Sequence, residues 1–210
     1  MDYQNEKQQV LDTVRLAYES DLIRMSAGNI STRTPDGNVA ITPSGIKYFR
    51  MKTEDISIVD MDGNQIEGPK SSSETPMHTA IYREIPRAQS IVHTHSIYAM
   101  VFAHLKKDIP LASVELMVCG APIPVAPWAS PGTAKAGQVT VDIFQNRPEL
   151  SVLLLRQHGL VALGTSLYQT YEMAYNAEIG LEVYHKASLV GEPKPFSADQ
   201  IAEIKEVYGL

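Results

Sequence analysis

Two short hairpin patterns in the first third of the chain limit the folds that it can adopt. The turn signal Pro-Asp-Gly at 35–37 separates an alternating segment at 30–33 from another at 39–42, and Asp-Gly at 62–63 follows a similar segment at 56–60. Short alternating segments joined by such turns are typical of antiparallel strands. The sequence therefore predicts a largely antiparallel sheet, and a doubly wound parallel sheet fits the pattern less well.

Helical patterns surround these strands. Val10, Val14 and Ala17 recur at the spacing of one helix face. A second helix is expected between Ser73 and Pro86, because proline stops a helix. Further helices are expected at 97–105, at about 167–189 and at the C-terminus, and further strands at 90–95, 152–156 and 160–163. Helices and strands mixed in this way predict an α/β sandwich.

Length and composition restrict the class of protein. No repeat, low-complexity tract or linker divides the 210 residues, so one domain spanning 1–210 is expected. The formal net charge is −6 with no long basic run, which argues against nucleic acid or an anionic membrane as a partner. No apolar run reaches membrane-spanning length, and the start of the chain lacks a secretory signal pattern. The single cysteine, Cys119, excludes an internal disulfide and fits a cytoplasmic protein.

His93 and His95 stand one residue apart at the end of the strand expected at 90–95. Side chains alternate faces along a strand, so both imidazoles are expected on the same side of the sheet. Two imidazoles that converge in this way suit a zinc-type divalent ion, which then needs a third and a fourth ligand from elsewhere. The pair is also compatible with a polar strand face, so the interpretation depends on whether further ligands can be found.

Two residues far from the histidine pair are candidates for the missing ligands. His158 lies where one strand turns into the next, beside Gly159, which lets the backbone approach closely. A solvated turn histidine is the alternative. Glu74 lies at the start of a helix, where a carboxylate either caps the helix or ligates a metal and takes a proton from a substrate. His78, one helical turn later, is interpreted as a buried structural histidine bonded to backbone.

Three small, polar loop segments predict a phosphate site. Backbone N–H groups in such turns, together with hydroxyls and a helix N-terminus, can bind phosphate without lysine or arginine. Neither a P-loop nor a dinucleotide glycine fingerprint is present. Ordinary caps and turns are the alternative for each segment taken singly. The segments are Gly28-Asn29, Ser44-Gly45 and Ser72-Ser73.

The chain resembles the class II aldolase/adducin family over nearly its whole length, because five segments stand in the family's order and spacing. The segments are Ser26-Ala27-Gly28-Asn29-Ile30-Ser31, Thr42-Pro43-Ser44-Gly45, Ser72-Ser73-Glu74, Val92-His93-Thr94-His95 and Gln157-His158-Gly159-Leu160. The resemblance is greatest to members that act on L-fuculose 1-phosphate. It implies a three-layer α/β/α sandwich with a largely antiparallel central sheet. It also implies a homotetramer with active sites at subunit interfaces.

The same resemblance implies a role for each matching residue. One zinc ion per subunit would be held by His93, His95 and His158. Glu74 would be a resting-state ligand that turns away when substrate arrives and then acts as acid and base. Tyr208 would assist at the site of a neighbouring subunit. The residues implied to bind the substrate phosphate are Gly28, Asn29, Ser44, Gly45, Ser72 and Ser73.

The implied activity is that of a zinc-dependent aldehyde-lyase of carbohydrate metabolism. Such an enzyme cleaves a ketose 1-phosphate, such as L-fuculose 1-phosphate, to dihydroxyacetone phosphate and an aldehyde through a metal-stabilised enediolate. A metal makes a Schiff-base lysine unnecessary, and no lysine of this chain stands out as one. The expected partner is thus a small sugar phosphate.

One segment departs from the family pattern. Members that act on fuculose 1-phosphate carry a tyrosine just before a Pro-rich stretch and supply it to the adjacent subunit. Here residues 111–117 read Leu-Ala-Ser-Val-Glu-Leu-Met, and no tyrosine occurs between Tyr98 and Tyr168. Glu115 is either a substitute acid or a surface carboxylate. Trp128 also stands where the family often has tyrosine, so the aldehyde half of the substrate is left open.

Three alternative functions share parts of this pattern. Ribulose-5-phosphate 4-epimerases of the family share the zinc histidines and a Ser-Ser-x-Thr-Pro-x-His motif, which this chain matches through His78. They usually carry aspartate in place of Glu74, so the longer carboxylate favours aldol cleavage. A sugar-phosphate dehydratase would use the same histidines and a glutamate base. An adducin-like binding domain would need no metal ligands, whereas this chain has all of them.

Overall fold

The computed structural model describes residues 2–105 and 107–209, which form a mixed α/β structure around one sheet. The sheet has eight strands in the order β4-β3-β2-β1-β5-β8-β7-β6. Each neighbouring pair is antiparallel except β6 and β7 at one edge, which are parallel. The strands are β1 (Asn29–Arg33), β2 (Val39–Ile41), β3 (Ser57–Val59), β4 (Gln65–Glu67), β5 (Ser90–Thr94), β6 (Val125–Ala126), β7 (Val152–Leu155) and β8 (Gly159–Gly164). The predicted antiparallel sheet is confirmed.

Both predicted hairpins form. The turn at 35–37 joins β1 to β2, with Thr32 opposite Ala40, and the turn at 62–63 joins β3 to β4. Strand β5 lies between β1 and β8, with Ile91 opposite Leu163 on β8 and His93 opposite Asn29 on β1. The strand that carries the histidine pair is therefore in the middle of the sheet.

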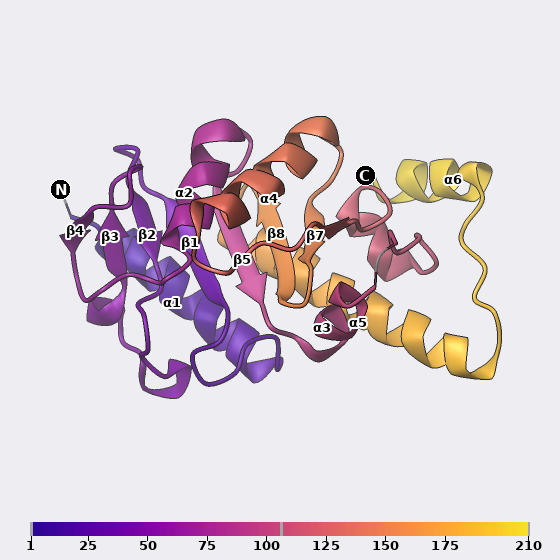
Figure 1. Cartoon of the computed structure of the whole chain (residues 1–210), viewed down its shortest axis with the longest axis horizontal. Coiled ribbons are helices and arrows are strands. Elements are labelled where there is room, and N and C mark those ends of the chain that lie inside the picture. Colours follow the sequence, from indigo (N-terminus) through magenta and orange to yellow (C-terminus); the bar gives the residue numbers. More distant parts are fainter. Residues whose placement is uncertain (1, 106, 210) are drawn as a thin grey trace.

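Helices cover both faces of the sheet, as Figure 1 shows. The helices are α1 (Gln4–Glu19), α2 (Thr75–Glu84), α3 (Ile97–Ala103), α4 (Ala134–Asn146), α5 (Leu167–Val190) and α6 (Ala198–Tyr208), with short 3-10 turns η1 (Tyr48–Arg50), η2 (Thr53–Asp55) and η3 (Val114–Cys119). Helices α1, α3 and α5 pack on one face, and α2 and α4 on the other. The predicted three-layer sandwich is confirmed, whereas α4 was not predicted.

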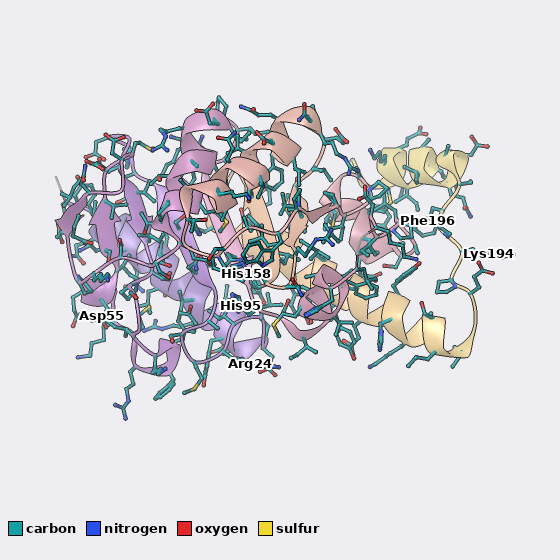
Figure 2. All side chains as sticks on the ribbon, viewed as in Figure 1. Arg24, Asp55, His95, His158, Lys194 and Phe196 are labelled. Carbon is teal, nitrogen blue, oxygen red and sulfur yellow. The ribbon has the colours of Figure 1, made fainter. Side chains whose placement is uncertain are left out.

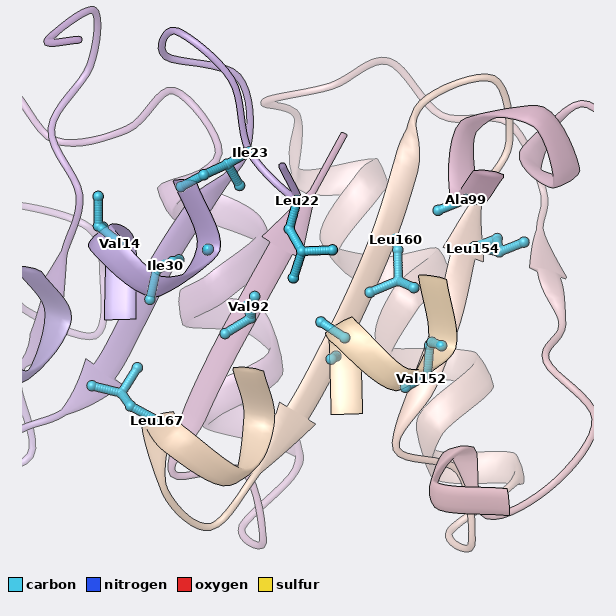
Figure 3. Close-up of a cluster of buried hydrophobic side chains, with 14 of the residues drawn as sticks. Val14, Leu22, Ile23, Ile30, Val92, Ala99, Val152, Leu154, Leu160 and Leu167 are labelled. Carbon is cyan, nitrogen blue, oxygen red and sulfur yellow. The ribbon is translucent and has the colours of Figure 1, made fainter. Parts of the chain in front are cut away.

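Side chains alternate between the two faces of the sheet, so those of each strand pack into two separate hydrophobic cores. Val92 of β5 and Leu160 of β8 belong to the core under α1, α3 and α5 (Figure 3). Ile91 and Val161 belong to the core under α2 and α4. His93 has the same parity as Ile91, so it points toward the α2 face of the sheet. The alternation of side chains therefore directs the His93 ring toward the start of α2.

The C-terminal part of the chain extends away from the sheet. Helix α5 ends in the exposed residues Leu189 and Val190, and α6 lies at the far end of the molecule, beyond an extended connection (Figure 1). No residue of α6 is buried. Among the described residues, every helix is too short or too polar to cross a membrane.

Gly159, the first residue of β8, allows two strands to meet closely beside the histidines. A Cβ atom at this position would lie 2.1 Å from the backbone oxygen of Thr94 and 3.3 Å from the His93 ring. We expect Gly159→Ala to lower the free energy of unfolding by about 1–3 kcal/mol, because a buried strand must move to admit the methyl group. Thermal or urea unfolding measures the change.

A matched control for this substitution is Gly191→Ala. Its Cβ would meet nothing within 4 Å, and its φ of −179° is ordinary extended backbone. The control should change the free energy of unfolding by no more than about 0.5 kcal/mol. Equal unfolding midpoints for the two variants would show that the close approach at Gly159 is not a constraint.

Candidate metal centre and active site

Four side chains from three parts of the fold converge at one end of the central strands. Glu74 precedes α2, His93 is the second-last residue of β5 and His95 follows the strand, and His158 lies in the turn that precedes β8. One candidate ligand atom from each of these residues lies within 4.8 Å of the others. Figure 2 shows His95 and His158 close together near the centre of the molecule. The structure thus brings together all four residues that the sequence indicated as metal ligands.

The ligand atoms point toward a common centre. Oε2 of Glu74 lies 2.8 Å from Nε2 of His93, and Oε1 of Glu74 lies 3.4 Å from Nε2 of His158. Nε2 of His93 lies 3.1 Å from Nε2 of His95. The three rings meet edge to face, with centroids 4.7 to 4.9 Å apart. Each imidazole therefore turns its Nε2 atom toward the others.

A backbone contact fixes which nitrogen of His93 is free. Nδ1 of the ring lies 2.8 Å from the carbonyl oxygen of Leu160, to which its N–H donates. Metal-binding histidines usually hold their second ring nitrogen in this way, which orients the ring and leaves the other nitrogen as a ligand. The pairing of β5 with β8 therefore directs Nε2 of His93 at Glu74.

Burial keeps two of the rings uncharged. It lowers the pKa of His95 to about 3 and that of His158 to about 4. Burial also lowers the pKa of His93, but the Glu74 carboxylate outweighs this and holds it above its ordinary value. Burial raises the pKa of Glu74, yet His93, His158 and Asn29 outweigh that effect and hold it well below its usual range. His95 and His158 are therefore in the neutral form and Glu74 in the ionised form that bind a metal, and binding at His93 would release a proton.

An unpartnered oxygen supports the fit of these residues to a metal ion. Oε1 of Glu74 is buried and has no hydrogen-bond partner. Leaving such an atom without a partner costs free energy, which a bound cation would remove. Three imidazole nitrogens and one carboxylate oxygen form a donor set that zinc takes readily. The residues present therefore fit a zinc-type ion.

Two features argue against the simpler interpretations of Glu74 and His158. Glu74 is the N-cap residue of α2, but its carboxylate makes no capping hydrogen bond to the helix. The side chain of His158 is only 11% exposed, so it is not a solvated turn residue. Gln157 adopts a φ of +55° just before it, a conformation that is uncommon for a residue other than glycine. The tight turn thereby holds His158 against the other rings.

A cavity of about 280 Å³ opens beside the four residues. Its wall contains every residue that the sequence indicated for phosphate binding, together with Glu74, His95 and His158. Gly28 and Gly45 lie there in the left-handed region, with φ of +94° and +78°. The predicted phosphate residues in the wall are Gly28, Asn29, Ser44, Gly45, Ser72 and Ser73. Three loops that are distant in the sequence therefore line one hollow.

Tyr208 does not reach this cavity within the chain. It lies on α6, is 63% exposed and lines a separate hollow with Phe196 and Ile204. Figure 2 places Phe196, which precedes α6, well apart from His95 and His158. A role for Tyr208 at a neighbouring subunit's site stays a prediction. Glu115 lies half-buried on η3, and Trp128 is exposed in the loop before α4.

Sequence reasoning placed His78 correctly in the core but gave it the wrong partners. The ring contacts the side chains of Asn29 and Ser31, where a backbone bond was expected. Asn29 in turn donates from Nδ2 to Oε2 of Glu74 over 2.9 Å. Asn29 and Glu74 are 45 residues apart, so no local spacing signals their contact. Asn29 is therefore a direct neighbour of the metal-ligand cluster as well as a residue of the cavity wall.

Comparison with known proteins places this geometry in a family. The family profile described as Class II Aldolase and Adducin N-terminal domain matches residues 8–185. The chain is 31% identical over 207 residues to 5-deoxy-D-ribulose 1-phosphate aldolase of Bacillus thuringiensis serovar kurstaki, covering 98% of this chain and 96% of the relative. It is 30% identical over 207 residues to L-fuculose phosphate aldolase of Escherichia coli K12, covering 96% and 94%. A solved L-fuculose 1-phosphate aldolase superposes with a TM-score of 0.92 at 28% identity, covering 100% of this chain and 99% of the other.

Proposed function

Because this chain belongs to the class II aldolase and adducin family and is a metal-dependent aldolase, we propose that it cleaves a ketose 1-phosphate to dihydroxyacetone phosphate and an aldehyde. One observation carries the proposal. A cluster of three imidazoles and a carboxylate opens onto a cavity whose wall is made of small, polar loop residues. A candidate metal-ligand set beside a cavity of about 280 Å³ suits a substrate with a carbonyl near a phosphate group.

We propose zinc as the ion, one per subunit, held by His93, His95 and His158, with Glu74 as a further ligand in the absence of substrate. When bound, the ion supplies Lewis-acid stabilisation of the negative charge that develops on the substrate's carbonyl and adjacent hydroxyl oxygens. The donor set and the unpartnered Oε1 atom of Glu74 support this assignment.

Glu74 is the residue proposed to move the proton. Breaking the bond between C3 and C4 leaves the electron pair on C3 and converts the C4 hydroxyl to the aldehyde carbonyl. The ionised Glu74 carboxylate takes up the proton that the C4 hydroxyl loses, and the resulting carboxylic acid delivers this proton to C3, which completes dihydroxyacetone phosphate. Before substrate binds, the contacts with His93, His158 and Asn29 hold the pKa of Glu74 well below its usual range and keep it ionised, so it is in the form that accepts a proton.

The loops of the cavity wall are proposed to hold the phosphate. Ser72 precedes α2, and its Oγ accepts from the backbone N–H of Glu74 over 3.2 Å, which orders the start of the helix. Ser44 and Ser73 are exposed toward the cavity, where their hydroxyls are free to donate. Backbone N–H groups of such loops and a helix N-terminus together suit a dianion.

We further propose that residues 1–210 act as one domain and assemble as a homotetramer. Large apolar side chains that remain exposed on α5 and α6 support an assembly that would cover them. Leu189 is 73% exposed, Val190 91% and Val207 73%. Tyr208 on the same C-terminal segment would then assist at a neighbouring subunit's site.

Two substrates follow from the names of the relatives. L-fuculose 1-phosphate would release a hydroxylated aldehyde, and 5-deoxyribulose 1-phosphate would release acetaldehyde. The absence of any tyrosine between Tyr98 and Tyr168 favours the second, because the hydroxyl that the fuculose enzymes supply from that region is missing here. The relative named for 5-deoxy-D-ribulose 1-phosphate also covers 98% of this chain.

A coupled assay for dihydroxyacetone phosphate, run over a panel of ketose 1-phosphates, tests the proposal. We expect metal-dependent release that a chelator abolishes and added zinc restores, with kcat/KM higher for 5-deoxyribulose 1-phosphate than for L-fuculose 1-phosphate. No release from any member, with interconversion of pentulose 5-phosphates or loss of water from a sugar phosphate instead, would overturn the aldolase assignment in favour of an epimerase or a dehydratase.

A further inference from the structure

A chain of buried side-chain hydrogen bonds runs from the core to Glu74. The hydroxyl of Tyr82 lies 2.7 Å from Oγ of Ser31, and Oγ of Ser31 lies 2.6 Å from Nδ1 of His78. Nε2 of His78 contacts Oδ1 of Asn29, whose Nδ2 donates to Oε2 of Glu74. Tyr82, Ser31 and His78 are fully buried, and Asn29 is 4% exposed. The array thus leads from inside the fold to the edge of the cavity.

The direction of each hydrogen bond follows from its end at Glu74. An ionised carboxylate only accepts, so Asn29 must present its NH2 group to Glu74 and its carbonyl oxygen to His78. That oxygen also only accepts, so His78 must donate from Nε2. Burial lowers the pKa of His78 to about 3, so the ring is neutral and its Nδ1 carries no proton. Nδ1 therefore accepts from Ser31.

The remaining bond is fixed in the same way. Ser31 uses its only hydrogen for His78, so its second contact must be an acceptance from the hydroxyl of Tyr82. Each member has one consistent orientation, and reversing any one of them would place two donors or two acceptors face to face. A buried network satisfied in this way is rigid, and a mismatch within it is costly.

From this array we propose that His78 is a positioning residue, which locks the amide of Asn29 so that its NH2 group faces Glu74. This inference rests on the proposed function of Glu74 as the acid and base. Without the His78 donor, the amide could rotate and turn its oxygen toward the carboxylate. Glu74 would then lose the Asn29 contact at Oε2 and keep only the contact with His93 there, while the three histidines stay in place.

The position of His78 supports a role in orientation. It lies on α2 one turn beyond Glu74, and it joins α2 to β1 through Asn29 and Ser31. It is absent from the residues that line the cavity and from the metal-ligand cluster. Its effect on the reaction must therefore pass through Asn29.

Comparison of His78→Leu with His78→Gln tests the proposal. Glutamine can place an N–H donor near the position of Nε2, whereas leucine keeps bulk and removes the donor. We expect His78→Leu to lower kcat by roughly 10–100-fold, the usual effect of losing a group that orients a metal-site residue. KM for the ketose 1-phosphate and the zinc content should stay near those of the parent, and His78→Gln should regain most of kcat. The control is His104→Leu, at the exposed residue that follows α3.

A second measurement covers the case in which His78→Leu does not fold. Long-range proton–nitrogen NMR on the unaltered protein, labelled at its 6 histidines, reports the tautomer of each ring. We expect His78 to be neutral with the proton on Nε2. A proton on Nδ1, a charged ring, an unchanged kcat in His78→Leu, or equal losses in the two variants would overturn the proposal.

The two proposals fail in different ways. If the parent protein releases no dihydroxyacetone phosphate from any ketose 1-phosphate, the proposed function is wrong, while the NMR experiment still tests the orientation of His78 and Asn29. If the parent is active and His78→Leu loses zinc in proportion to kcat, His78 supports the metal ligands instead and the positioning role is wrong.

Discussion

Glu74→Gln is expected to lower kcat by about 10²–10⁴-fold, the range that a positioned acid or base contributes. Glutamine keeps the shape of the side chain and an oxygen that can accept from Asn29, but it cannot carry the transferred proton. Most of the bound metal should remain, because the three histidines still supply their nitrogens. Steady-state release of dihydroxyacetone phosphate and metal analysis of the same preparation measure both quantities.

Glu84→Gln is the matched control for this substitution. It makes the same chemical change at the exposed end of α2, outside the cavity. Its kcat should equal that of the parent. A Glu74→Gln enzyme that retains parental kcat at full zinc occupancy would show that another group moves the proton, and Glu115 or a neighbouring subunit's Tyr208 would then be examined.

His158→Ala should remove most of the zinc and reduce activity to the background of the assay. The ring supplies one of only three imidazoles, and its Nε2 atom lies 3.4 Å from Oε1 of Glu74. Since a bound metal stabilises the folded state by mass action, zinc should raise the melting temperature of the parent much more than that of the variant. Metal analysis after dialysis and thermal melts with and without zinc check these expectations.

His104→Ala provides the comparison for the metal experiment. His104 is exposed, and its ring donates to the carbonyl of Met100 in α3 over 2.8 Å. Zinc content, activity and the zinc-dependent melting shift should be those of the parent. Equal zinc retention in His158→Ala and His104→Ala would remove His158 from the ligand set.

Local patterns were enough to predict much of the fold. The two Asp-Gly turns predicted the hairpins, and the alternation along β5 placed His93 and His95 on one side. Helix α4 was missed because Gly137 and several β-branched residues weaken its helical pattern. Close packing of α4 against α2 accounts for the glycine, since a Cβ atom at Gly137 would lie 2.9 Å from the Cβ atom of Ala80. Tertiary contact there outweighs local preference.

The candidate site, like the fold, could be predicted from the sequence only in part. The four candidate ligands could be selected by residue type, and the structure places their side chains together. The partners of His78 did not follow, since they depend on how α2 lies across β1. The contact between Asn29 and Glu74 spans 45 residues and arises from the sheet and helix arrangement alone. Hydrogen-bond orientation within the array could be worked out only once those neighbours were known.

The four candidate ligands are far apart in the sequence, so they leave the ribosome at different times during synthesis. Glu74, His93 and His95 are synthesised well before His158, which follows β7. Strand β8 must also pair with β5 before the Leu160 carbonyl can orient the His93 ring. A nascent chain on the ribosome therefore has no complete ligand set until most of the protein has emerged. With the proposed ligand set, metal capture is then a late event, and a chain truncated before the β7–β8 turn would leave the ribosome without His158.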